Sequence, residues 1–288
     1  MMARGLDHLA HAVRDLDAGA ALYRSLGFTV GARNRHPWGT HNNIVQFPGC
    51  FIELLTLAEP EKLGDDGFSK LFGAYTGDFL KRHEGLSLLI LQSEDAAADE
   101  AAFRDVGIAA SDTMRFEREG KRPDGTAVKV AFSLAFAEDK LASDIHFATC
   151  QQHYPENFWN PAFQKHANSA SGVAGVVAVA GEPERHRAFM QAFAGADATG
   201  SGDGFGMATP RGTIEVVTPK TFVARYGVAA PDVTKGMRLA AIRFAVDDAS
   251  LMQNVPELAG IAGLYAENAA IIGANDAMGA VLVFEPGR

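Results

Sequence analysis

The feature that most constrains the fold of this 288-residue chain is one order of elements that recurs four times. In each copy, an apolar segment is followed by a segment with helical spacing and then by short apolar segments separated by turn residues. The copies begin near Gly5, Gly85, Gly172 and Arg238. Each copy therefore predicts one strand, one helix and three further strands.

The first copy shows how these elements are recognised. Residues 5–13 alternate between apolar and polar side chains, which predicts a strand. In the next segment Asp15 or Asp17 is the expected N-cap of a helix, and Gly27 is the expected C-cap. The apolar side chains between them recur at helical spacing: Leu16, Ala20, Tyr23 and Leu26. With the three short strands that follow, the copy forms a βαβββ module.

A single module has an apolar face that it cannot cover alone, so the modules are expected to pair. The sequence predicts an α+β fold in which four βαβββ modules pair into two cup-shaped mixed sheets. Residues 1–165 form the first expected domain and residues 166–288 the second, with a segment rich in Asn, Pro and Ser (157–171) at the junction. Residues 59–84 have helical patterning and are expected to cover the mouth of the first cup.

Composition and short motifs exclude several classes of protein. The hydrophobic content of 47% and charged content of 21% are typical of globular chains, and the net charge of −9 argues against a nucleic-acid partner. No apolar run is long enough for a membrane span, and two cysteines fit a reduced compartment, so a cytoplasmic location is expected. Nucleotide-binding glycine loops and a nucleophile elbow are absent from the sequence.

The paired modules resemble the vicinal oxygen chelate superfamily, also known as the glyoxalase, bleomycin-resistance and dioxygenase fold. The segments that carry the resemblance are GLDHLAHAVRDLDAGAALYRSLGF, HPWGTHNNIVQF, CFIELL and CQQHYPENFWNP. They are similar to the glyoxalase-like branch of the superfamily, and the four copies resemble the layout of type I extradiol dioxygenases. The resemblance implies a divalent metal at the centre of a cup, with ligands from the first and last strands of each copy.

Three residues are the candidate metal ligands under this resemblance. His8 lies on a strand face with two small residues, which leave space in front of it. Glu53 alternates with Phe51 and Leu55, and a carboxylate between buried neighbours requires a partner or a cation. His146 is aligned with Glu53 in the last strand of the second copy. Two His and one carboxylate suit Fe(II), and Mn(II), Zn(II) and Ni(II) are alternatives.

The ligand set departs from the patterns of known branches. Leu88 occupies the position that His8 has in the first copy, so a fourth ligand is missing, and His153 replaces His146 if the alignment is shifted. The set lacks the second glutamate of glyoxalase I. The last two copies contain one histidine, His186, which is expected to face solvent on a helix. The second cup is therefore interpreted as degenerate and structural.

Other polar residues are candidates for catalysis and substrate binding. His41 or His153 is the expected proton carrier, because the pKa of imidazole lies near neutral pH. The expected substrate contacts are Asn42, Gln46, Tyr154 and Trp159. Each site residue also has a structural interpretation: His8 bonded to backbone, Glu53 paired with an arginine, His146 as a core histidine, Trp159 as packing.

The expected function is that of a metal-dependent enzyme, a lyase or isomerase or an extradiol-type dioxygenase, acting on a small molecule with adjacent oxygens. Two other functions stay open. A metal-free binding or resistance protein would use the same cup, with His8 and Glu53 bonded to protein groups. An inactive scaffold would self-associate through strand edges, and a homodimer is an expected state.

Overall fold

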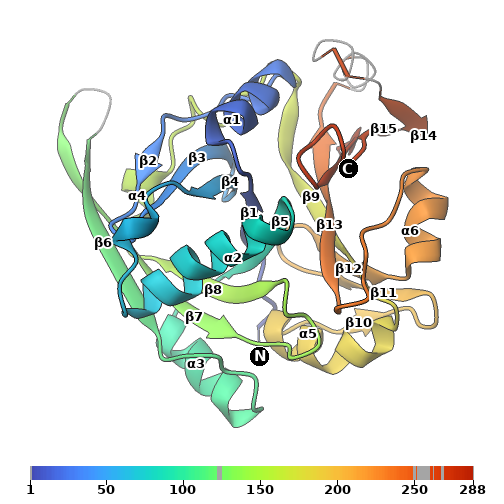
Figure 1. Ribbon diagram of the computed structural model, residues 1–288, viewed down its shortest axis with the longest axis horizontal. Coiled ribbons are helices and arrows are strands. Elements are labelled where there is room, and N and C mark those ends of the chain that lie inside the picture. The colour runs from blue at the N-terminus through green and yellow to red at the C-terminus, as the bar shows by residue number, and fades with distance from the viewer. Residues whose placement is uncertain are drawn as a thin grey trace.

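The computed structural model describes residues 2–121, 125–248, 251, 260–261, 263–266 and 269–287, and these residues form two eight-stranded sheets (Figure 1). The strands of the first sheet are β1 Leu6–Ala12, β2 Asn34–Arg35, β3 Thr40–Phe47, β4 Cys50–Leu57, β5 Gly85–Gln92, β6 Met114–Lys121, β7 Ala127–Ala137 and β8 His146–Gln152. Those of the second are β9 Ala170–Val179, β10 Ala198–Thr199, β11 Gly204–Ala208, β12 Thr213–Val217, β13 Arg238–Val246, β14 Leu264–Ala266, β15 Ala269–Ile272 and β16 Val281–Pro286.

The two sheets have the same strand order, which confirms the predicted fold of four modules in two mixed sheets. The orders are β2-β3-β4-β1-β5-β8-β7-β6 and β10-β11-β12-β9-β13-β16-β15-β14. In the first sheet β1 pairs in parallel with β4 and antiparallel with β5, and β9 pairs in the same way with β12 and β13. The first strand of each module therefore lies at the centre of its sheet.

Helices connect the first and second strands of the first three modules: α1 Leu16–Ser25, α3 Ala96–Asp105 and α5 Arg187–Ala194. Asp15 is the N-cap of α1, since its carboxylate accepts hydrogen bonds from two backbone amides of the first turn. The helix predicted for the fourth module, at residues 247–260, lies largely outside the described residues.

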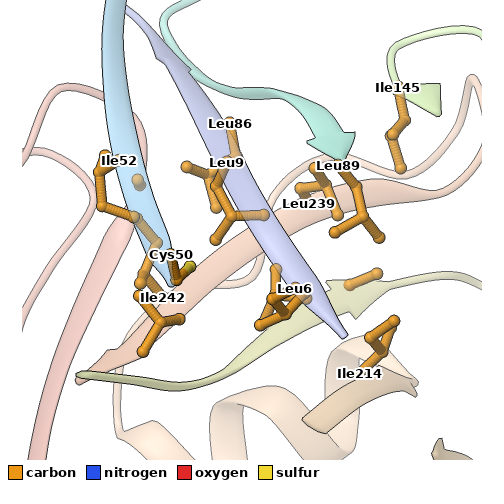
Figure 2. Packing of buried hydrophobic residues seen from close by; sticks show 14 of the residues in the cluster. Leu6, Leu9, Cys50, Ile52, Leu86, Leu89, Ile145, Ile214, Leu239 and Ile242 are labelled. Atoms are coloured by element: carbon orange, nitrogen blue, oxygen red, sulfur yellow. The ribbon is translucent and has the colours of Figure 1, made fainter. Parts of the chain in front are cut away.

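The main core lies between the two sheets rather than inside either cup. Figure 2 shows side chains from both halves in one cluster, with Leu6 and Leu9 of β1 facing Ile214, Leu239 and Ile242 of the second half. All five side chains are almost fully buried. Because neighbouring side chains of a strand point to opposite faces, the other face of β1 is left to line the first cup.

A bulge in β1 changes this alternation at one residue. The pairing of β1 with β5 shifts there, because Leu6 lies opposite Leu91 whereas His8 lies opposite Ile90. Asp7 is the extra residue, and its carboxylate lies beside the ring of His8. A simple alternating pattern does not predict this placement.

The insertion between the first two modules covers the first cup, as predicted. It contains the 3-10 turn η1 Pro60–Lys62, the π-helix η2 Ser69–Ala74 and α2 Tyr75–Arg82, which crosses the face of the first sheet in Figure 1. Phe72 of η2 joins Trp38, Leu55 and Leu88 in a buried cluster. The second cup is filled instead by Phe222 and other apolar residues of α6 Pro219–Tyr226.

The expectation that His186 faces solvent is wrong. His186 ends the 3-10 turn η3 Pro183–His186, is only 5% exposed, and has Nδ1 2.6 Å from Oδ2 of Asp139. The residue faces the first half of the molecule, so this bond links the halves. Among the described helices, none is long and apolar enough to cross a membrane. Cys50 and Cys150 are both free and buried.

Candidate functional site

A small cavity of about 70 Å³ lies at the bottom of the first cup. Its polar lining residues come from four strands and one loop, and are His8, His36, Asn42, Glu53 and Arg118. Its walls are mostly aromatic: Trp38, Phe51, Phe68, Phe72, Phe116, Phe132 and Phe158. A few polar groups in an apolar enclosure are typical of a small-molecule site.

His8 is held in one orientation by its neighbour in the bulge. Its Nδ1 lies 2.6 Å from Oδ1 of Asp7, and its ring stacks on Phe51 with centroids 4.2 Å apart. The side-chain amide of Gln152 donates to the other carboxylate oxygen of Asp7 at 3.0 Å. Because a carboxylate only accepts, Nδ1 of His8 donates to Asp7, and in the neutral ring the lone pair is then on Nε2. No described residue bonds to that Nε2.

Glu53 faces the same cavity from β4. Its Oε1 accepts a hydrogen bond of 2.6 Å from the amide of Asn42, whose own oxygen accepts one of 2.9 Å from Asn34. The partner of the buried carboxylate is therefore a neutral amide and not an arginine. Asn42 lines the cavity and holds Glu53 in place, so one of the four predicted substrate contacts lies beside a predicted ligand.

His36 and Arg118 also line the cavity and were not among the sequence candidates. Nδ1 of His36 lies 2.8 Å from the hydroxyl of Thr40, and its ring stacks on Trp38 with centroids 4.7 Å apart. Burial lowers the pKa of His36. The negative charge of Glu53 raises this pKa and the positive charge of Arg118 lowers it, so the pKa stays below its ordinary value. His36 is therefore a neutral hydrogen-bonding residue. Its signal in the sequence is its place just before a cup-lining strand.

His146 does not occupy the position predicted for it. In the first module, β1 pairs with β4 so that His8 lies opposite Phe51 and Ala10 lies opposite Glu53. In the second module, β5 pairs with β8 so that Leu88, the equivalent of His8, lies opposite His146. Ile90, the equivalent of Ala10, lies opposite Ala148. The alignment of His146 with Glu53 is therefore wrong by two residues, and Ala148 is the equivalent of Glu53. The second module is longer and less regular than the first, which obscured this register.

The contacts of His146 are those of a core histidine. Its Nδ1 donates to the backbone carbonyl of Leu71 at 3.0 Å, and its ring stacks against Tyr75 of α2. Burial lowers the pKa of His146 to about 4, so the ring is neutral. His146 therefore joins the insertion to the first sheet.

The structure does not bring His41 or His153, the two predicted proton carriers, to the cavity. His41 lies on the face of β3 opposite to Asn42, and its Nε2 is 2.7 Å from the carboxylate of Glu59. His153 follows β8 and has Nε2 2.8 Å from the hydroxyl of Ser133 on the outer face of β7. Neither residue lines the cavity. In both cases the side chains that face the cup are those at alternate positions of the strand, and the histidine is displaced from these positions by one residue.

The other predicted contacts lie further out. Gln46 and Trp159 line an outer pocket of about 740 Å³, which shares Ile44, Arg118 and Phe158 with the cavity. Gln46 is bonded to the backbone carbonyl of Phe158, the last residue of the short helix α4 Pro155–Phe158. Tyr154 lines neither space.

In the described part of the chain, the donor atoms of His8, Glu53 and His146 do not all lie within 4.8 Å of one another. Among the described residues, the group of possible ligands whose donor atoms lie within 4.8 Å of one another is Asp7, His8 and Cys150. Burial and the carboxylates of Asp7 and Glu53 raise the pKa of the Cys150 thiol, so a nearby positive charge is required before it ionises.

The second cup contains a built-in cation at the equivalent place. Arg243 lies opposite Val283 and Glu285 lies opposite Ala245, the same pattern as His8 and Glu53 in the first cup. The guanidinium of Arg243 bonds both oxygens of Glu285, at 3.0 and 2.7 Å, and also bonds Glu215. This arrangement supports the interpretation of the second cup as structural.

Comparisons with known proteins place the chain in a family. A family model described as a glyoxalase-like domain matches residues 6–193. A hypothetical protein from Staphylococcus aureus has a similar structure, with a TM-score of 0.67, 14% identity, and coverage of 98% of this chain and 99% of that one. A halotolerant catechol dioxygenase has a TM-score of 0.57 and 9% identity over 99% and 87%. These likenesses show the fold. No curated protein sequence matches.

Proposed function

Because the chain belongs to the glyoxalase-like family of the vicinal oxygen chelate superfamily, we propose that its first cup is the reaction site for a small molecule with adjacent oxygens. The observation that carries this proposal is the free Nε2 of His8, held by the Asp7 bond in a buried cavity beside Glu53. A lone pair in a cavity lined by aromatic side chains is suited to accept a proton from a bound substrate.

Each polar residue has a part in this proposal. Asp7 fixes the ring and stabilises the positive charge that develops on His8 when Nε2 takes a proton. Glu53 accepts a hydrogen bond from a substrate hydroxyl, and Asn42 keeps that carboxylate in position. The insertion covers the cup and limits water there, which strengthens electrostatic interactions inside.

A cation held by Asp7, His8 and Cys150 is the second candidate, favoured by the closeness of their donor atoms. Thiolate, imidazole and carboxylate together suit Zn(II), and Fe, Mn and Ni stay among the predicted ions. When bound, such an ion supplies Lewis acidity that stabilises negative charge on a substrate oxygen. The metal-free binding protein stays a third possibility, since His8 and Glu53 are each bonded to a protein group.

The proposal is tested by hydrogen–deuterium exchange at carbon in a panel of small hydroxyketones and ketoaldehydes, followed by NMR. We expect the wild-type protein to catalyse exchange for at least one member. His8→Gln is expected to slow it by about 100-fold or more, since that is the usual contribution of a general base. His153→Gln is the control, because this histidine lies on the outer face of the sheet.

The outcomes separate the candidates. Exchange that persists in His8→Gln, or no exchange with any member, contradicts the proposal. Metal content measured on the same samples addresses the cation: an ion present in the wild type and lost in both His8→Gln and Cys150→Ser supports the second candidate. Ligand binding without exchange or metal supports the binding protein.

A further inference from the structure

Arg118 is a guanidinium at the site with no partner in the described part of the chain. It lies on β6 in the cup-facing alternation with Phe116, and it lines both the cavity and the outer pocket. No hydrogen bond or ion pair joins it to any described residue, whereas Arg115 on the outer face of the same strand bonds His153 and Glu117. Burial lowers the pKa of Arg118, and no carboxylate offsets this effect.

A partly buried guanidinium without an anion is costly, because it has lost hydration and gained no charged partner. Glu156 is the acidic side chain that lines the outer pocket, and it forms no ion pair with Arg118. The guanidinium has a planar fork of donors that matches a carboxylate. An anion bound at the junction of the two spaces would supply the missing partner.

The charges of the site fix which end of a ligand can lie there. The carboxylate of Glu53 lines the cavity and that of Asp7 lies beside His8, both buried, and they repel a second anion. The same end offers acceptors, at Glu53 and at Nε2 of His8, for a ligand hydroxyl. A ligand that satisfies both ends has a hydrogen-bond donor at the bottom and an anion at Arg118.

The side chains that line the cavity between Glu53 and Arg118 indicate which group joins the hydroxyl and the anion of the ligand. Phe116, Phe132 and Phe158 line the cavity together with Trp38 and Phe51, and Phe158 also lines the outer pocket. The cavity volume of about 70 Å³ suits a small planar group. Aromatic rings pack favourably against such walls.

We infer that the first cup binds hydroxylated aromatic carboxylic acids, with the carboxylate on Arg118 and the hydroxyl directed toward Glu53 and His8. The inference names a substrate class for the proposed reaction site, and it rests on that proposal only for the role of the hydroxyl end. The carboxylate end depends on Arg118 alone.

The experiment compares 4-hydroxybenzoate, 4-hydroxyphenylacetate and 4-hydroxyphenylpropionate with their uncharged primary amides. The two tryptophans of the chain, Trp38 and Trp159, line the cavity and the outer pocket, so their fluorescence reports binding directly. Calorimetry provides an independent affinity. We expect at least one acid to bind the wild type about tenfold tighter than its amide or better.

The variants assign the preference to one side chain. Arg118→Gln is expected to abolish the preference for the acid, and Arg118→Lys to retain part of it. Arg115→Gln is the matched control, because it removes the same charge from the opposite face of the same strand, and its preference is expected to match the wild type. Equal affinity for acid and amide, an unchanged preference in Arg118→Gln, or no binding of any acid overturns the inference.

The test is distinct from that of the proposed function. Suppose that the preference for acids depends on Arg118 but that His8→Gln does not slow hydrogen–deuterium exchange. The inference on the ligand is then supported, and the proposed reaction site is contradicted. If exchange depends on His8 but acids and amides bind equally well, the proposed reaction site is supported and the inference on the ligand is contradicted.

Discussion

The chemistry that we propose for the first cup depends on a few side chains with asymmetric environments. His8 and Glu53 face the cavity as strand alternation predicts, so their placement can be predicted from sequence. Asp7 cannot, because a bulge brings it to the ring of His8. Arg118 lies in a module whose register could not be predicted, since the second copy is longer and less regular than the first.

A single amide stabilises the buried carboxylate of the site. Asn42→Ala is expected to lower the free energy of unfolding by about 2–3 kcal/mol, because Glu53 loses its donor while it stays buried. In the Glu53→Gln background the same change is expected to cost less, which a double-mutant cycle in urea measures. Equal costs in the two backgrounds would show that Asn42 does not stabilise the charge of Glu53.

At the scale of elements, the insertion is joined to the sheet by a histidine that must stay neutral. The helical patterning of residues 59–84 predicts both its structure and its place over the cup. The sequence does not predict that His146 contacts it, because a register error of two residues moves that histidine to the equivalent position of Glu53. The contact with Leu71 and Tyr75 is long-range and has no local signal.

Acid is expected to weaken this contact. The pKa of His146 is about 4 in the folded protein against an ordinary 6.5, so its stabilising effect is complete above 6.5 and is lost as pH falls toward 4. Between pH 7 and pH 5 the loss attributable to this residue is about 2 kcal/mol. Urea unfolding of wild type and His146→Gln at both pH values measures it. A variant with the full acid sensitivity of the wild type contradicts this assignment.

The central ion group of the second cup provides another prediction at this scale. Arg243→Met leaves Glu285 without its cation and Glu215 paired with Arg225 alone, and we expect a loss of about 3 kcal/mol in the free energy of unfolding. Binding at the first cup is expected to stay unchanged in conditions where the variant is folded. Altered ligand affinity there would show that the second cup is more than structural.

At the scale of the whole molecule, the two sheets share one core. The repeated order of elements predicts the two sheets and their strand order. It does not predict that their outer faces pack against each other, because which apolar faces meet is decided by side chains distant in sequence. The boundary at residue 165 separates two sheets that share one cluster of buried residues, the cluster between their outer faces.

Unfolding is therefore expected to be one cooperative transition. Both tryptophans belong to the first half, so Ile242→Ala in the second half tests the coupling. We expect this change to cost about 3 kcal/mol and to shift the tryptophan transition and the circular dichroism transition equally. A tryptophan transition that does not move would show that the halves unfold independently.

The tautomer of His8 tests the account of the site most directly. In protein labelled with ¹⁵N-histidine, the account predicts that Nδ1 carries the proton and that Nε2 has the chemical shift of a bare lone pair. It also predicts that the Nε2 signal moves when a ligand of the cup is added. A proton on Nε2, or a signal that no ligand changes, would contradict the assignment of this nitrogen as the reacting atom.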